Sequence, residues 1–223
     1  KYTQKYGSDV LRLYLAFGFA YTEGGQWDEN GFNSIVRFVG KIQRIIEKYI
    51  AGNYENTDSF FDDELNYVRN NTIKVITYDL EKLQYNTCVA RLMELASALE
   101  KGLKKKTCSK KLLKNTMRDF LILLSPFAPH LSEELWEVLS YDYSIFNQRF
   151  PVCDEAAAIK SNLTLPVQVN GKIRTKISIA KNADDNMVEK IILEDVKIAE
   201  YIAGKEIVKI IVIKDKIANV IVK

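Results

Sequence analysis

The feature that most constrains the fold is a change of hydrophobic period near residue 163. Up to about residue 140 apolar residues recur at helical spacing, whereas Leu165, Val167 and Val169 occupy every second position. This alternation leads into Asn170-Gly171. Asn-Gly is the strongest short-range hairpin signal, because both central residues of a type I′ turn need a positive φ. The chain is therefore predicted to change from helices to a sheet.

The first 140 residues are predicted to form a bundle of antiparallel helices. The helical period is clearest between Asp28, a suitable N-cap, and Gly52, a suitable helix end. The same period predicts further helices over residues 62–83, 86–102, 109–126 and 129–139. Short loops between helices of this length favour antiparallel packing.

The rest of the chain is predicted to hold a linker and a small domain. Residues 141–162 show no sustained period and are interpreted as the linker. Within 163–223 the hairpin is followed by an amphipathic helix from about Asp184 to Ile202 and by two β-branched runs, Ile207 to Ile213 and Ile217 to Val222. We therefore expect a mainly α fold: a helical bundle over 1–140, then a small α+β domain of order β-β-α-β-β.

The composition leaves little room for catalysis. The chain has one histidine, His130, and three widely separated cysteines, Cys88, Cys108 and Cys153. Few groups other than carboxylates then remain for acid–base chemistry at neutral pH. The cysteine spacing fits neither a disulfide framework nor a zinc site, and it predicts a reducing, cytoplasmic compartment. No apolar run approaches the roughly 18–20 residues of a membrane span. We expect no catalytic residue, no metal site and no membrane contact.

The formal net charge of +3 is unevenly distributed. From Leu163 onward there are 11 Lys and Arg against 8 Asp and Glu, whereas residues 1–162 carry 21 of each. The whole excess therefore belongs to the small domain, where a basic surface indicates an anionic partner.

Two groups of cations are candidates for binding RNA phosphates. Rows of cations suit a nucleic-acid backbone. In the helical part the spacing of four, three and four residues predicts one stripe, which we call the basic row: Arg37, Lys41, Arg44 and Lys48. A solvated helix face is the alternative interpretation of this row.

The second group lies directly after the predicted turn. Lys172, Arg174 and Lys176 alternate along one strand, so period-two spacing predicts one shared face, opposite Ile173 and Ile177. A cationic sheet face backed by an apolar one suits RNA or other phosphates.

Several segments together resemble the class I aminoacyl-tRNA synthetases. KYGSDVLRLY at 5–14 resembles their segment after the KMSKS loop, WDENG at 27–31 the entry to their helical anticodon-binding domain, and LQYNT at 83–87 its middle. PFAPHLSEELW at 126–136 is the densest match, and valyl, isoleucyl and methionyl enzymes share versions of it. LPVQVNGKIR at 165–174, with Gly204-Lys205, is similar to the C-terminal domain of the bacterial-type leucyl enzymes.

The resemblance implies a division of labour. Neither the HIGH nor the KMSKS signature is present, so the chain resembles a C-terminal fragment that holds leucine-accepting tRNA. The parent enzyme would use ATP and Mg²⁺ to attach leucine, as a monomer, in a catalytic domain of the same polypeptide; the fragment itself would bind no cofactor. The resemblance implies recognition by shape and phosphate contacts. Two alternatives remain: the anticodon-binding region of a sister synthetase for Val, Ile or Met, and a protein-interaction module.

Overall fold

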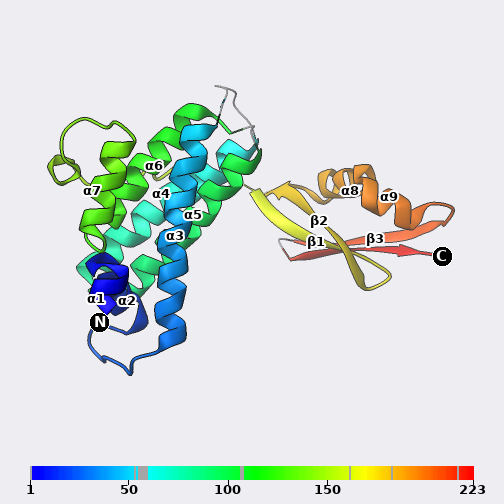
Figure 1. Ribbon diagram of the computed structural model, residues 1–223. Coiled ribbons are helices and arrows are strands. Elements are labelled where there is room, and N and C mark those ends of the chain that lie inside the picture. The colour runs from blue at the N-terminus through cyan, green and yellow to red at the C-terminus, as the bar shows by residue number, and fades with distance from the viewer. Residues whose placement is uncertain are drawn as a thin grey trace. The chain divides into compact units, whose positions relative to one another are not determined.

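Helices and strands separate along the chain as the hydrophobic period predicts (Figure 1). The computed structural model describes residues 2–52, 54, 60–105, 108–160, 162–181, 183–214 and 216–223. The chain divides into two units, Lys1–Ile159 and Lys160–Lys223, of which the first is helical and the second holds a sheet with helices. The predicted fold class, a mainly α chain with a small α+β domain, is confirmed.

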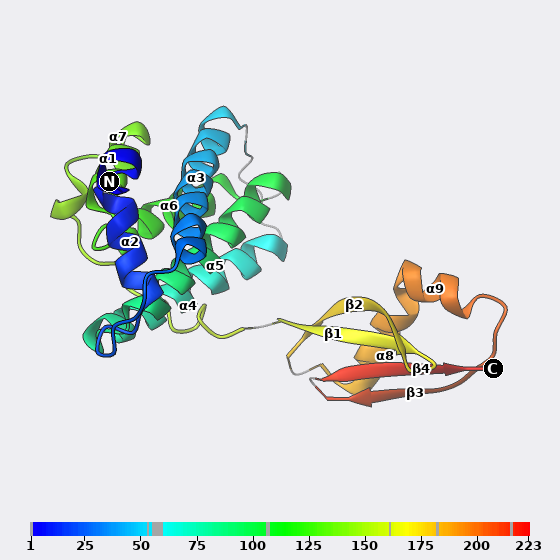
Figure 2. The same cartoon turned by 60° about the horizontal axis from the view of Figure 1, so that its bottom comes forward.

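The helical unit is built around one central helix. Its elements are α1 (Tyr2–Tyr6), α2 (Ser8–Gly18), α3 (Glu29–Ala51), α4 (Phe60–Glu81), α5 (Tyr85–Lys105), α6 (Lys110–Leu124), α7 (Pro129–Val138) and the 3₁₀ helix η1 (Ile145–Asn147). The central helix is α5, which packs beside α2, α3, α4 and α6 (Figures 1 and 2). Its side chains Leu92, Leu95 and Leu99 are completely buried.

The ends of α3 are fixed by the residues predicted to fix them. The Asp28 carboxylate accepts hydrogen bonds from the backbone N–H groups of Asn30 (3.1 Å) and Gly31 (2.8 Å). The helix ends at Gly52, whose N–H donates to the Tyr49 carbonyl. A helix start leaves its first N–H groups without backbone partners, and an Asp side chain satisfies them. Because both ends of α3 are fixed, the position of each of its side chains along the helix axis is fixed as well.

A carboxylate from α2 caps α7. Asp9 is only 8% exposed, and its Oδ2 accepts a hydrogen bond from the Leu131 N–H at 2.7 Å. Its Oδ1 lies 2.9 Å from His130 Nδ1. The His130 side chain is itself 80% exposed, so the single histidine lies at the surface. The contact joins two segments that are far apart in sequence and ties the start of the chain to α7.

We predict that Asp9→Ala destabilises the helical unit by about 1–3 kcal/mol, because a buried backbone N–H loses its partner. Urea unfolding followed by far-UV circular dichroism measures this change in the free energy of unfolding. Asp142→Ala is the matched control, because Asp142 is exposed and its side chain has no partner among the described residues. An equal loss of stability in both variants contradicts the role assigned to Asp9.

Residues 141–159, predicted to be part of a linker, pack against the helical unit instead. Ile145 is buried, and its N–H donates to Glu133 Oε2 at 2.8 Å. Trp136 Nε1 donates to the Tyr143 carbonyl at 3.0 Å. Further along, the Asp154 N–H donates to Asn70 Oδ1 at 2.9 Å. Single hydrogen bonds and single buried side chains leave no hydrophobic period in the sequence, so the sequence pattern does not reveal these contacts. The division between the units falls after Ile159, and residue 161 of the predicted linker lies outside the described residues.

The small unit is a four-stranded sheet with one covered face. Its strands are β1 (Asn162–Val169), β2 (Lys172–Ala180), β3 (Ile207–Ile213) and β4 (Ile217–Val222), in the order β2-β1-β4-β3. The outer pairs are antiparallel, and β1 runs parallel to β4. Two helices, α8 (Asp185–Glu194) and α9 (Val196–Ile202), supply Val188, Ile192 and Ile198 to the core of the covered face (Figure 1).

The single helix predicted over 184–202 is wrong in one respect, because it is broken at Asp195. Asp195 has an extended backbone (φ −71°, ψ 121°), and its carboxylate accepts a hydrogen bond from the Ile198 N–H at 3.0 Å. An Asp side chain competes with helical hydrogen bonds inside a helix and is favoured at a cap. The break starts α9 as a separate helix.

Asn170 and Gly171 form the predicted turn and also extend the sheet. Both have positive φ, 48° and 78°, as a type I′ turn requires. The Asn170 side chain then imitates a strand backbone: its Nδ2 donates to the Val222 carbonyl and its Oδ1 accepts from the Val222 N–H, each at 3.0 Å. The hairpin is therefore tied to β4 through one amide side chain.

We predict that Asn170→Ala lowers the free energy of unfolding of the small unit by about 1–3 kcal/mol, because two hydrogen bonds are lost and alanine is strained at positive φ. Urea unfolding monitored by amide hydrogen exchange of β4 measures the effect. Asn186→Ala, at an exposed position in α8, is the control and should be neutral or slightly stabilising. Unchanged protection of Val222 in Asn170→Ala would contradict this assignment.

Candidate nucleic-acid interface

The four cations of the basic row lie on one side of α3, as their spacing predicts. Arg37, Arg44 and Lys48 are exposed, and Lys41 is half-buried. Arg37, Lys41 and Arg44 line a hollow of about 310 Å³ together with Ser34, Phe38, Met93 and Ser97. The last two residues belong to α5, so the hollow lies between two helices.

Lys41 and Lys48 are held by groups on α5. Lys41 Nζ donates to Ser97 Oγ at 2.9 Å and lies 3.4 Å from Glu100 Oε2. Lys48 Nζ lies 4.0 Å from the other oxygen of Glu100. Lys104, one turn beyond Glu100 on α5, lies 3.4 Å from that same oxygen. One carboxylate is thus shared by three lysines.

The two arginines of the row are differently placed. Among the residues that the structure describes, neither Arg37 nor Arg44 has an ion-pair partner. A Cβ added at Gly40 would make only an ordinary van der Waals contact with Arg44 Nη1, at 3.4 Å, so this guanidinium lies against the helix near Gly40. Guanidinium groups bind phosphate in a bidentate way. The hollow therefore presents two guanidinium groups that have no acidic partner in the described part of the chain.

The partners on α5 were missed by the sequence reasoning. Ser97, Glu100 and Lys104 are spaced by three and four residues, which does place them on one side of a helix. That spacing does not indicate which neighbouring helix they face, so their contact with the basic row required the structure.

The prediction that Lys172, Arg174 and Lys176 share one face is wrong, because a β-bulge interrupts β2. Gln168 pairs with Ile173, but the preceding residue, Val167, pairs with Thr175. Arg174 is therefore the extra residue of the bulge. An extra residue reverses the alternation of side chains beyond it. As a result Ile177 is buried, at 5% exposure, whereas Ile173 is 57% exposed on the other face.

The three cations accordingly lie on two sides of the sheet. Lys176 pairs with Pro166 and faces the side that no described helix covers. Lys172 pairs with the core residue Val169 and lies on the helix-covered side, exposed at the end of the sheet. The guanidinium carbon of Arg174 lies 4.4 Å from the ring centroid of Tyr201 on α9, a cation–π contact on that same side. The candidate surface of the small unit is thus the edge formed by the turn and α9.

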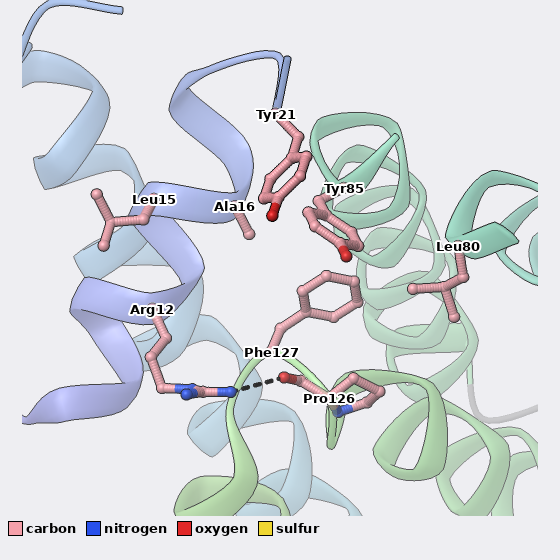
Figure 3. A pocket seen from close by; sticks show the side chains of 8 residues that line it. All are labelled: Arg12, Leu15, Ala16, Tyr21, Leu80, Tyr85, Pro126 and Phe127. Atoms are coloured by element: carbon pink, nitrogen blue, oxygen red, sulfur yellow. Dashed lines mark hydrogen bonds between the residues drawn. The ribbon is translucent and has the colours of Figure 1, made fainter. Parts of the chain in front are cut away.

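A separate apolar pocket of about 470 Å³ lies in the helical unit and was not anticipated (Figure 3). Figure 3 shows Tyr21, Tyr85 and Phe127 converging on it, and Arg12 at its side donating to the Pro126 carbonyl at 3.0 Å. The Tyr21 and Tyr85 rings meet edge to face with centroids 5.3 Å apart. Its lining thus offers aromatic faces and one cation.

No helix among the described residues is long and apolar enough to cross a bilayer.

A family model identifies the class of the protein. The model described as "Anticodon-binding domain of tRNA ligase" matches residues 62–192, more than half of the chain. The chain belongs to this family. The match runs from α4 into α8 and so includes the hairpin as well as most of the helical unit.

Two similar proteins show which kind of tRNA ligase the chain resembles. The chain is 45% identical to "Leucine--tRNA ligase" of Clostridium tetani over 227 residues, a match that covers 100% of this chain and 28% of the relative. It is likewise 45% identical to "Leucine--tRNA ligase" of Caldanaerobacter subterraneus subsp. tengcongensis, with 99% and 28% covered. The resemblance drawn from the motifs is confirmed. The chain spans about 28% of the length of these relatives.

A solved structure shares the fold. The ternary complex "Agrobacterium radiobacter K84 agnB2 LeuRS-tRNA-LeuAMS" matches 99% of this chain and 30% of its own chain, with a TM-score of 0.66 and 23% sequence identity. That protein was crystallised with tRNA.

Proposed function

We propose that this chain is the tRNA-holding part of a leucine–tRNA ligase, and that the basic row of α3 contacts the phosphates of the tRNA stem. The observation that carries the proposal is the hollow between α3 and α5, where Arg37 and Arg44 have no acidic partner among the described residues. Guanidinium groups aligned along a helix suit a phosphate backbone, whose neutralisation supplies most of the affinity for nucleic acid.

In the complete enzyme, chemistry and tRNA holding would be separated. The catalytic domain of the same polypeptide would bind ATP and Mg²⁺ and esterify leucine to the tRNA, in a cytoplasmic monomer. The role of this chain would be to orient the RNA and to raise the effective concentration of its acceptor end at that domain. The small unit would add a second contact through Lys172 and Arg174.

The sister-synthetase alternative is disfavoured, because the relatives described above are leucine–tRNA ligases. A protein-interaction role is favoured by one observation in the small unit. Ile173, Ile211 and Ile213 are 57%, 39% and 50% exposed on the face of the sheet that no described helix covers. Exposed apolar side chains on one face are typical of contact with another macromolecular surface. Binding of the chain to a protein with no affinity for tRNA would favour this second function.

A third prediction concerns the basic row. Arg37→Ala and Arg44→Ala should each flatten the slope of log Kd against log salt for leucine tRNA by about 0.7–0.9, the value for one lost phosphate contact. Fluorescence anisotropy with the chain of residues 1–223 and labelled tRNA measures the slope, with a non-cognate tRNA for comparison.

Arg149→Ala is the control for charge alone, because Arg149 is an exposed arginine of the helical unit outside the hollow. If Arg37→Ala and Arg44→Ala behave like this control, the basic row does not bind the RNA.

A fourth prediction concerns the hairpin. Because Lys172 and Arg174 share the helix-covered side while Lys176 faces away, one RNA surface cannot engage all three alike. Lys172→Ala and Arg174→Ala should each reduce the salt slope by about 0.7–0.9, and Lys176→Ala should leave it unchanged. The same titration measures this difference. Equal reductions from Arg174→Ala and Lys176→Ala would rule out the proposed edge.

A further inference from the structure

An acidic residue of α5, Glu100, contacts two lysines of the basic row. The two carboxylate oxygens of Glu100 reach three lysines from two helices: Lys41 at 3.4 Å, Lys48 at 4.0 Å and Lys104 at 3.4 Å. The Glu100 side chain is 29% exposed, so one of its sides remains open to solvent. Lys41 is bonded to Ser97 in addition.

The surroundings keep this acid ionised. Partial desolvation would raise the pKa of Glu100, but Lys104 and Lys41 outweigh it and hold the pKa below its usual value. The carboxylate therefore stays charged at neutral pH. Three positive charges against one negative charge leave the cluster cationic, yet each lysine already has an anionic neighbour.

A carboxylate among lysines has the chemistry of a phosphate oxygen. Both are anionic oxygen acceptors, and both bind ammonium groups through charge-assisted hydrogen bonds. An RNA phosphate that approaches Lys48 or Lys104 meets an ammonium group whose charge is already partly compensated by Glu100. Arg37 and Arg44 have no such competitor among the described residues.

We propose that Glu100 is an internal counter-anion of the RNA-binding surface, which competes with nucleic-acid phosphate for Lys41, Lys48 and Lys104. This inference rests on the proposed function of the basic row. The competition lowers the sequence-independent attraction of the surface for any polyanion. Discrimination against wrong partners is often built from such opposing elements. Binding then depends more on Arg37 and Arg44, which have no acidic competitor among the described residues.

The test compares three variants of α5. Glu100→Gln removes the negative charge while keeping the size and polarity of the side chain. Glu94→Gln makes the same change of net charge on the same helix, at a residue that pairs only with Arg91 among the described residues and is 59% exposed. Glu100→Asp keeps the charge on a side chain one methylene shorter, so its affinity should lie closer to that of the unchanged chain than the affinity of Glu100→Gln does. Thermal unfolding of each variant verifies that it is folded.

The measurement is the Kd of the chain for leucine tRNA and for a generic RNA duplex, between 0.05 and 0.2 M salt. Glu100→Gln should bind both RNAs more tightly, with a salt slope steeper by about 0.9 for each lysine released. Each added contact corresponds to roughly a threefold change in affinity across that salt range. The duplex should gain at least as much as the tRNA, so the preference for tRNA should not increase.

The outcomes separate this inference from the proposed function. If the unchanged chain binds tRNA and Arg37→Ala weakens it, but Glu100→Gln matches Glu94→Gln, the counter-anion role is overturned and the RNA surface stands. If Arg37→Ala and Arg44→Ala have no effect on binding, both proposals are overturned. A stronger gain from Glu100→Gln than from Glu94→Gln, and a smaller gain from Glu100→Asp than from Glu100→Gln, supports the inference.

Discussion

The structure of the helical unit depends on the burial of α5. This helix has neighbours on most of its circumference, and its leucines at 92, 95 and 99 are completely buried. Burial of side chains of this size contributes about 1.5–3 kcal/mol each, so α5 cannot rotate without losing a large part of the core. The polar strip that remains, which includes Ser97, Glu100 and Lys104, is therefore held in one direction. Because α3 packs beside that strip, the partners of the basic row are determined by the hydrophobic core.

In the small unit the corresponding constraint is the alternation of side chains along β2. Ile177 and Ile179 must face the core, and both are at most 5% exposed. A strand that continued this alternation back to the turn would bury the odd-numbered residues and expose all three cations on one face. The bulge at Arg174 breaks the alternation, which brings Ile173 to the uncovered face and Arg174 over Tyr201. Bulges commonly redirect a side chain in this way near functional sites.

The sequence predicts those parts of the fold that local signals determine. Asp28 and Gly52 bound α3 because capping depends on a few adjacent residues, and Asn170-Gly171 forms the turn because its backbone requires positive φ. The anchors of residues 141–159 were missed, since they depend on single hydrogen bonds, such as the one from Asp154 to the distant Asn70. The break at Asp195 was missed although its cap is local, because apolar residues keep a helical spacing across it, as Ile192 and Val196 do. The position of the bulge depends on the register with β1. The contacts of Glu100 with Lys41 and Lys48 depend on which helix faces α5. Neither is a property of one segment alone.

The packing of α3 beside α5 also explains how the charges of the helical part are distributed. Residues 1–162 carry as many acids as bases, which by composition alone gives no reason to expect an RNA surface. However, equal numbers of acids and bases over the whole segment do not require that they cancel at each place on its surface. Arg37 and Arg44 are seven residues apart, about 10 Å along the helix axis, and Lys41 between them is tied to Ser97 and Glu100. Flexible ammonium groups are thus paired with an acid of the protein, while the planar guanidinium groups of Arg37 and Arg44 have no acidic partner among the described residues. Under the proposed function, the spacing of the two arginines would matter beside the total charge of the surface, since helical RNA is recognised mostly by its shape and by phosphate contacts.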